Sequence, residues 1–128
     1  MILRPGSGGL PLVAVVCAVP LLSEALSAIL DSIAEVRSFP AHGGDTSGLL
    51  RSLGPDAIVV DTEEEAENAA PFARERGLAL VHVLLRERRL RVLSGDGEMW
   101  EERDNGGASP EAIRNILVGA IYGPGRAA

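Results

Sequence analysis

The chain contains no lysine, so all twelve of its basic residues are arginines. This absence excludes any reaction that needs a lysine ammonium group or a Schiff base. Only 3% of the residues are aromatic, which leaves little material for stacking nucleobases. The formal net charge is −6, and an acidic chain is poorly suited to neutralising phosphate backbones. We therefore expect no nucleic-acid partner.

Cysteine and histidine are also scarce. Cys17 is the only cysteine, so the chain has no internal disulfide and no cysteine-based metal site. It falls in a predicted buried strand, where a thiol acts as a small apolar side chain and its pKa rises. His42 and His82 lie on different predicted elements, and a buried His82 bonded to the backbone is favoured over a shared metal site. We expect no metal and no cofactor.

The sequence also lacks a long hydrophobic run. The apolar stretch from Leu10 to Leu22 is too short to span a bilayer. Only Arg4 precedes it, Glu24 follows closely, and no persuasive leader cleavage site is present. This stretch is typical of a strand that enters a helix. We expect a cytoplasmic protein with no membrane partner.

What the chain does have is enough apolar material for one domain of 128 residues, 46% of them hydrophobic. Its most informative segment is Gly54-Pro55-Asp56-Ala57-Ile58-Val59-Val60-Asp61. The apolar residues are consecutive rather than alternating, which predicts a strand covered on both faces, as in a parallel sheet. Asp61 would then lie at the carboxyl end of the strand, where ligands gather in such sheets.

The rest of the chain predicts alternating strands and helices. We expect strands near residues 12–19, 36–39, 57–60 and 78–85, with helices at 21–33, 45–53 and 62–76 between them. Such alternation indicates right-handed crossovers and a doubly wound sheet. Residues 1–10 are expected to form a flexible lead-in, 11–123 the domain, and 124–128 a flexible tail.

After residue 85 the pattern changes. Residues 90–93 and 99–102 favour two short strands joined by the turn Ser94-Gly95-Asp96-Gly97. Ser109-Pro110-Glu111 then opens a last helix, which Gly123-Pro124 stops. The predicted fold is α/β, a three-layer doubly wound and mainly parallel sheet of order 2-1-3-4-5, with a β-hairpin in place of the fourth helix.

On these residues, the stretch 12–122 resembles the receiver domain of response regulators, a flavodoxin-like fold. The resemblance implies that Asp61 corresponds to the aspartate that accepts a phosphoryl group. It also implies two acidic residues after the first strand to bind a divalent cation, a Ser or Thr ending the fourth strand, and a Lys ending the fifth.

The chain departs from this pattern at every position except Asp61. The first strand ends Val16-Cys17-Ala18-Val19 without a carboxylate, and the fourth ends Val83-Leu84-Leu85 without a hydroxyl. The lysine does not exist. A phosphoryl group near the acidic run would also meet repulsion of about 1 kcal/mol or more per near charge. The sequence therefore predicts a degenerate pseudo-receiver that is not an enzyme.

Asp61 has two interpretations. It is either a vestigial phosphoacceptor or cation ligand, or a cap whose carboxylate accepts N–H bonds from the turn that starts the next helix. We favour the cap. The acidic run from Glu63 to Glu67 is similarly read as a solvated helix start.

The segment 86–104 is the predicted interaction surface. It contains a cluster of arginines and the only tryptophan, residue types that are enriched at binding hot spots. The surface comprises Arg86, Arg88, Arg89, Arg91, Met99 and Trp100. Trp100 either anchors a partner or covers the core of its own domain, and the sequence favours neither.

Together these features predict a non-catalytic signalling or regulatory domain that acts through protein–protein interaction. The partner is expected to be a second copy of the chain, bound through the surface of the hairpin and the last helix. The alternative is an atypical receiver that still responds to phosphorylation, or to a small ligand, at Asp61.

Overall fold

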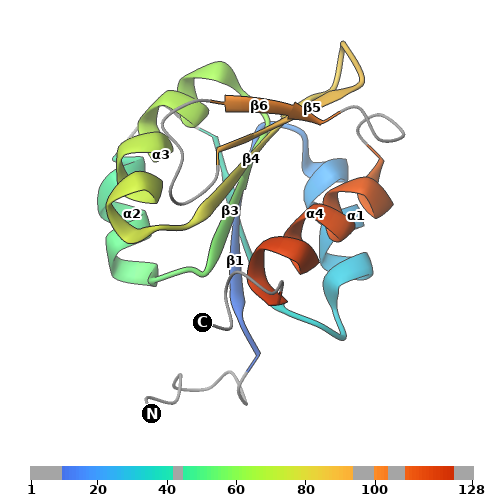
Figure 1. Ribbon diagram of the computed structural model, residues 1–128, viewed down its shortest axis with the longest axis horizontal. Helices are drawn as coiled ribbons and strands as arrows, with labels where there is room; N and C mark the ends of the chain where they lie inside the picture. Colours follow the sequence, from blue (N-terminus) through green and yellow to red (C-terminus); the bar gives the residue numbers. More distant parts are fainter. Residues whose placement is uncertain (1–9, 42–44, 94–99, 104–108, 123–128) are drawn as a thin grey trace.

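A mixed six-stranded sheet forms the centre of the protein in a computed structural model, which describes residues 10–41, 45–93, 100–103 and 109–122 (Figure 1). The strands are β1 (Leu12–Cys17), β2 (Glu35–Pro40), β3 (Ala57–Val60), β4 (Ala79–Leu84), β5 (Arg89–Leu93) and β6 (Trp100–Arg103). The helices are α1 (Pro20–Leu30), α2 (Thr46–Leu53), α3 (Glu63–Arg76) and α4 (Pro110–Tyr122). The predicted α/β class is confirmed.

The strands lie in the order β2-β1-β3-β4-β5-β6. The three pairings among β2, β1, β3 and β4 are parallel, whereas β5 runs antiparallel to β4, and β6 antiparallel to β5. Only residues 85–88 separate β4 from β5, and a parallel connection needs a dozen residues or more. The predicted order ended at a fifth strand, and the structure corrects it by adding β6 as a sixth strand at the edge.

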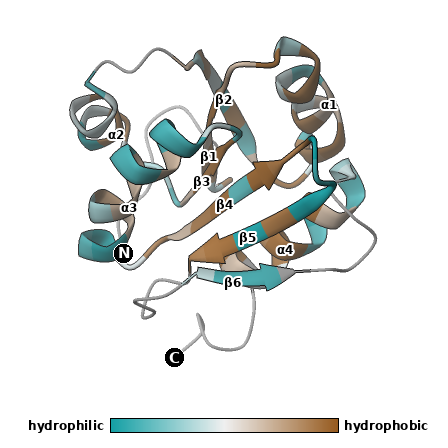
Figure 2. Cartoon of the chain, turned by 90° about the horizontal axis from the view of Figure 1, so that it is seen from above, coloured by the Kyte–Doolittle hydropathy of each residue, from teal (hydrophilic) through white to brown (hydrophobic). Residues whose placement is uncertain are grey.

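Helices cover both faces of the sheet. Helices α1 and α4 lie on one face, and α2 and α3 lie on the other (Figures 1 and 2). Alternate residues of β1 pack against the two layers of helices. Val13 and Val15 face α1 and α4, while Ala14 and Val16 face α2 and α3. This two-sided burial explains why β1, β3 and β4 read as consecutive apolar runs.

Local capping residues set the helix ends. Gly54 and Gly77 end α2 and α3 with φ of +64° and +69°, the left-handed conformation that glycine adopts without steric cost. Thr62 begins α3 by accepting a hydrogen bond from the backbone N–H of Glu65. Ser109 begins α4 in the same way, through the N–H of Ala112 at 3.2 Å. The predicted ends at Gly77 and Ser109 are confirmed.

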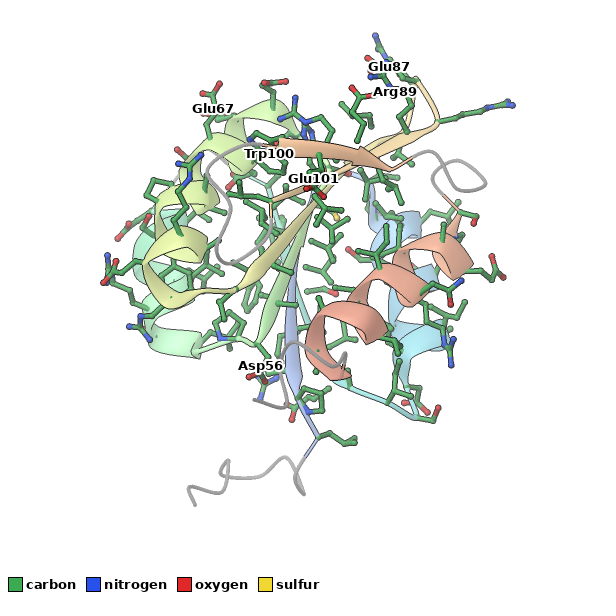
Figure 3. The ribbon with its side chains drawn as sticks, viewed as in Figure 1. Asp56, Glu67, Glu87, Arg89, Trp100 and Glu101 are labelled. Carbon is green, nitrogen blue, oxygen red and sulfur yellow. The ribbon has the colours of Figure 1, made fainter. Side chains whose placement is uncertain are left out.

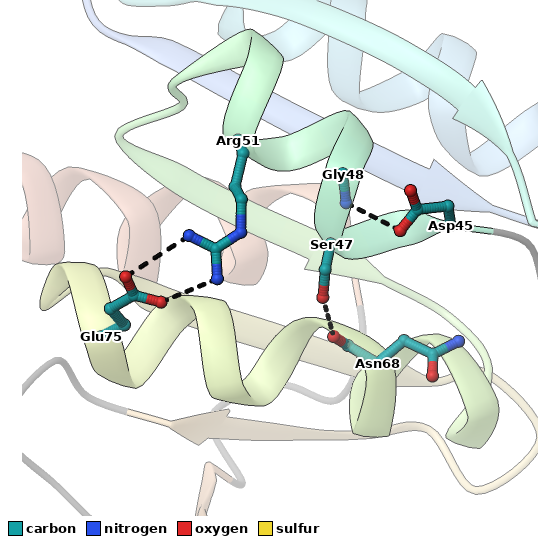
Figure 4. A network of polar contacts seen from close by, with 6 residues as sticks. All are labelled: Asp45, Ser47, Gly48, Arg51, Asn68 and Glu75. Carbon is teal, nitrogen blue, oxygen red and sulfur yellow. Dashed lines mark hydrogen bonds and ion pairs between the residues drawn. The ribbon is translucent and has the colours of Figure 1, made fainter.

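Polar contacts align α2 with α3 (Figure 4). Arg51 donates both of its terminal guanidinium nitrogens to the carboxylate of Glu75, at 2.9 and 3.4 Å. One turn earlier, the Ser47 hydroxyl donates to the carbonyl of Asn68. Because the Arg51–Glu75 pair is half exposed and screened by solvent, it adds little to stability and mainly fixes the register of the two helices.

Several predictions fall on residues outside the described ranges. They concern the lead-in before Leu10, His42, the turn at 94–97, Met99 and the stop at Gly123-Pro124. Among the described helices, none has the length and apolar character needed to cross a bilayer.

Candidate functional site at the strand ends

Strand β3 is held to β1 by an aspartate at each of its ends. Before β3, Asp56 accepts the backbone N–H of Leu12 at 2.7 Å through its carboxylate. After β3, Asp61 accepts the N–H of Ala18 at 2.7 Å through Oδ1 and the N–H of Val19 at 3.1 Å through Oδ2. Each carboxylate therefore binds one end of β1, although each aspartate lies more than forty residues from its partner in the sequence.

Asp61 supplies a cap that α1 lacks. Val19 is the N-cap residue of α1, its side chain makes no capping bond, and the first turn contains no acidic residue. The carboxylate of Asp61 accepts the N–H of Val19 and that of Ala18 just before it, and its negative charge interacts favourably with the helix N-terminus. The expectation that Asp61 caps the helix that follows it is wrong, because Thr62 caps α3.

The neighbourhood of Asp61 contains few groups suited to phosphoryl transfer. No cluster of three or more His, Cys, Asp or Glu side chains that could hold a metal ion occurs within the described ranges. The thiol of Cys17, at the end of β1, is close enough to Asp61 to be affected by its charge. Burial, followed by the negative charge of Asp61, raises the pKa of this thiol well above its ordinary value, so it stays protonated and inert.

Glu65 is the residue that the sequence-based interpretation missed. The sequence pattern predicts that Glu65 belongs to a solvated acidic run. In the structure, however, it is only 1% exposed, and its carboxylate accepts a hydrogen bond from the hydroxyl of Thr46 on α2. Glu63, Glu64 and Glu67 are exposed as expected. The spacing Thr62-x-x-Glu65 is that of a capping box, and this signal could have singled out Glu65.

His82 is buried on β4, as predicted, with 1% of its surface exposed. Its Nδ1 has no hydrogen-bond partner within the described ranges, whereas the sequence favours a bond to the backbone. Burial and then the positive charge of Arg91, opposite it on β5, lower the pKa of His82 below its ordinary value. Glu63, Asp61 and Glu87 act in the other direction but do not cancel this effect.

The predicted arginine surface is divided between internal contacts and solvent. Figure 3 labels Arg89 and Trp100, which lie on the two edge strands β5 and β6. Arg89 pairs with Glu102 of β6, and the guanidinium carbon of Arg91 lies 4.5 Å from the centre of the Trp100 ring. Arg86 and Arg88 remain exposed in the turn between β4 and β5. Met99 lies outside the described residues.

Trp100 is half-buried and packs against the core on the α2/α3 side of the sheet. Of the two interpretations that the sequence left open, this contact fits the one in which Trp100 covers the core of its own domain. It leaves Arg86 and Arg88 as the part of the predicted surface that is available to a partner.

An open pocket lies at the opposite end of the sheet from Asp61, where α1 leads into β2. Its volume is about 360 Å³, and it is lined by Leu10, Ser27, Asp31, Ala34, Glu35 and Val36. Parallel sheets collect ligands at the carboxyl ends of their strands, so this pocket at the amino ends is not where the fold favours a site.

Comparison of the chain with protein-family models, with curated proteins and with solved structures gave no match in any of the three. The resemblance to receiver domains therefore remains a prediction from the residues.

We predict that Asp61→Asn lowers the free energy of unfolding by about 1–3 kcal/mol, because the amide keeps only one of the two oxygens that accept N–H bonds from Ala18 and Val19. Urea unfolding followed by circular dichroism measures this loss. Asp45→Asn is the matched control, since Asn caps a helix as well as Asp does and should preserve the bond to Gly48. Equal effects of the two substitutions would contradict the role assigned to Asp61.

The lowered pKa of His82 predicts that the stability of the fold depends on pH. Its pKa is lowered in the folded state, so the unfolded chain binds the proton more readily. Stability is therefore fully present above the unfolded pKa of about 6.5 and declines as the pH falls below it, by at most about 1.4 kcal/mol per pH unit. Unfolding curves of the native chain and of His82→Gln, between pH 7.5 and 5.5, measure this effect. The variant should show a flatter profile, and identical slopes would refute the assignment to His82.

Proposed function

We propose that this chain is a non-catalytic, receiver-like domain that regulates by binding a protein, and that the protein it binds is a second copy of itself. The main support is the hydrogen bonding of Asp61. Both oxygens of this carboxylate accept backbone N–H groups just before α1. The side chain therefore stabilises the fold at the position where the aspartate of a receiver accepts a phosphoryl group.

The binding surface we propose is the strand-end rim, formed by residues 18–21, 61–64 and 85–88. The three exposed large apolar side chains among the described residues all lie on it: Val19, Leu21 and Leu85. Leu21 is 73% exposed, and residues 18–21 form an unbroken exposed apolar segment. Grouped apolar side chains at a surface are typical of an interaction site.

Charges of both signs flank these apolar side chains. Glu63 and Glu64 at the start of α3 are exposed on the rim, and Arg86 and Arg88 are exposed in the turn after β4. A two-fold symmetric dimer uses the same patch on both copies, so the patch must complement itself. A rim that carries apolar, acidic and basic side chains meets this requirement, because the acidic groups of one copy can face the basic groups of the other. Such contacts also reduce the repulsion between two chains of net charge −6.

This surface differs from the one expected from the sequence, which combined the hairpin with the last helix. It keeps the basic turn of the hairpin, Arg86 and Arg88. It replaces the last helix by the start of α1, because the apolar residues of α4 pack against the sheet and α1. It omits Arg89 and Arg91, whose contacts lie within the sheet.

We predict that the protein dimerises at micromolar concentration and that Leu21→Asp weakens the dimer about tenfold or more, since it places a charge at the centre of the apolar segment. Sedimentation equilibrium measures the dissociation constant. Leu21 lies in the first turn of α1, where an acidic residue suits the helix, so the fold should be retained.

Ala28→Asp is the matched control, because it introduces the same charge at an exposed position of the same helix, two turns away from the rim. Its dimer should be as strong as that of the native chain. A native chain that stays monomeric, or a dimer weakened equally by both substitutions, would contradict the proposed surface.

The proposal also predicts no response to phosphoryl donors. Acetyl phosphate with Mg²⁺ should give no phosphoryl adduct in the intact mass of the protein, and beryllofluoride should leave its dissociation constant unchanged. The reason is that the carboxylate of Asp61 faces backbone N–H groups, with no neighbouring acidic pair after β1 to hold the cation. An adduct that disappears in Asp61→Asn would favour the alternative of an atypical receiver.

A further inference from the structure

Two buried nitrogens lack a hydrogen-bond partner in the described part of the chain, and they belong to residues that face each other. They are Nδ1 of His82 on β4 and Nε of Arg91 on β5. The two residues are directly paired in the antiparallel register, so their side chains leave the sheet on the same face. Two unrelated packing defects would not be expected to fall on one cross-strand pair.

Trp100 completes the cluster from β6. Its ring meets the His82 ring edge to face, with the ring centres 6.0 Å apart and the planes at 64°. The guanidinium group of Arg91 lies over the same indole, 4.5 Å from its centre. His82 is two residues before the end of β4, so the cluster lies toward the carboxyl ends of the parallel strands, where α/β sheets bind ligands.

The chemistry of the two nitrogens restricts what can occupy the site. A buried N–H group without an acceptor is costly, and such groups in native proteins generally bond to water, an ion or a ligand. The Nε of arginine can only donate, so the occupant must present an acceptor atom. The acidic residue in register with Arg91 is Glu102, but Glu102 pairs with Arg89, which leaves the charge of Arg91 without a carboxylate partner in the described structure.

We propose that the His82–Arg91–Trp100 cluster binds the carboxylate group of a small-molecule ligand. Arg91 donates from Nε to one oxygen, His82 donates from Nδ1 to the other, and the indole of Trp100 lies beside the bound group. His82 is then the tautomer that carries its proton on Nδ1. None of the three residues belongs to the strand-end rim, so the ligand site and the proposed dimer surface can be tested with separate substitutions.

A carboxylate fits this position better than a doubly charged phosphate or sulfate. Asp61, Glu63 and Glu87 are close enough to His82 to act on it electrostatically, so each additional negative charge at the site meets repulsion from three carboxylates. One negative charge matches the single guanidinium group available. The planar geometry of a carboxylate also matches donors that come from two neighbouring strands.

The test uses the fluorescence of Trp100, the only tryptophan of the chain. Sodium acetate is titrated into the native protein at pH 7.5 against sodium chloride at equal ionic strength, with sodium sulfate as a third series. We expect a saturable change in emission with acetate, and none with chloride or sulfate. No change with acetate would mean that water alone serves the two nitrogens. A sulfate response equal to that of acetate would show no preference for a carboxylate. Either result would overturn the proposal.

Arg91→Lys and Arg89→Lys form a matched pair, since both make the same change on alternate residues of β5. The first removes Nε and should weaken acetate binding about tenfold or more, while the second should leave it within about twofold of the native value. Equal affinity in the two variants would count against the site.

A measurement on the native chain covers the case in which Arg91→Lys fails to fold. In ¹⁵N-resolved spectra, acetate should shift the Arg91 Nε–H and the His82 ring resonances with one common saturation curve, and should leave the Nε–H of Arg51 on α2 unchanged. Shifts spread over all arginine side chains, or absent at His82 and Arg91, would refute the proposal.

Discussion

Two aspartates join β3 to β1, one at each end of the strand pair, and the positions of the neighbouring helices follow from this connection. Asp56 and Asp61 flank a strand of only four residues, and each uses its carboxylate to bind backbone N–H groups at one end of β1. Bonds to a charged acceptor are worth about 1.5–3 kcal/mol each, more than neutral ones. Because β1 and β3 are neighbouring interior strands, joining them also fixes the positions of the strands against which α1 and α3 pack.

The side chain of Asp61 connects this structural role with the function that we propose. In a receiver, the aspartate after the third strand must be accessible to a donor and a cation. Here the same position serves as an N-terminal cap for α1, whose own residues provide none. The surface around it carries the exposed apolar and charged side chains of the strand-end rim. In the function we propose, these strand ends form a docking surface, while the order of strands and helices stays the one that the sequence predicts for a receiver-like domain.

Much of this architecture could be predicted from the sequence, and the exceptions share a physical cause. Consecutive apolar runs, Gly54, Gly77 and Ser109 identify the buried strands and helix ends because these signals depend on neighbouring residues. The N–H groups of Ala18 and Val19 donate to Asp61, and the hydroxyl of Thr46 donates to Glu65. These bonds join elements far apart in the chain, and no local pattern specifies them. The reversal of β5 follows from a short turn, but the edge position of β6 depends on long-range pairing. Likewise, the apolar run around His82 places this residue in the core but does not show that its Nδ1 lacks a hydrogen-bond partner among the described residues.

Amide hydrogen exchange at Ala18 and Val19 measures whether the Asp61 carboxylate holds these two N–H groups. Both N–H groups lie outside the hydrogen bonds of β1 and precede the first turn of α1, so their protection reports on the Asp61 carboxylate alone. We expect both amides to exchange slowly in the native chain and at least about tenfold faster in Asp61→Asn, while the amide of Val15 in the middle of β1 stays protected. Fast exchange at Ala18 and Val19 in the native chain, or rates that the substitution leaves unchanged, would contradict this role of Asp61.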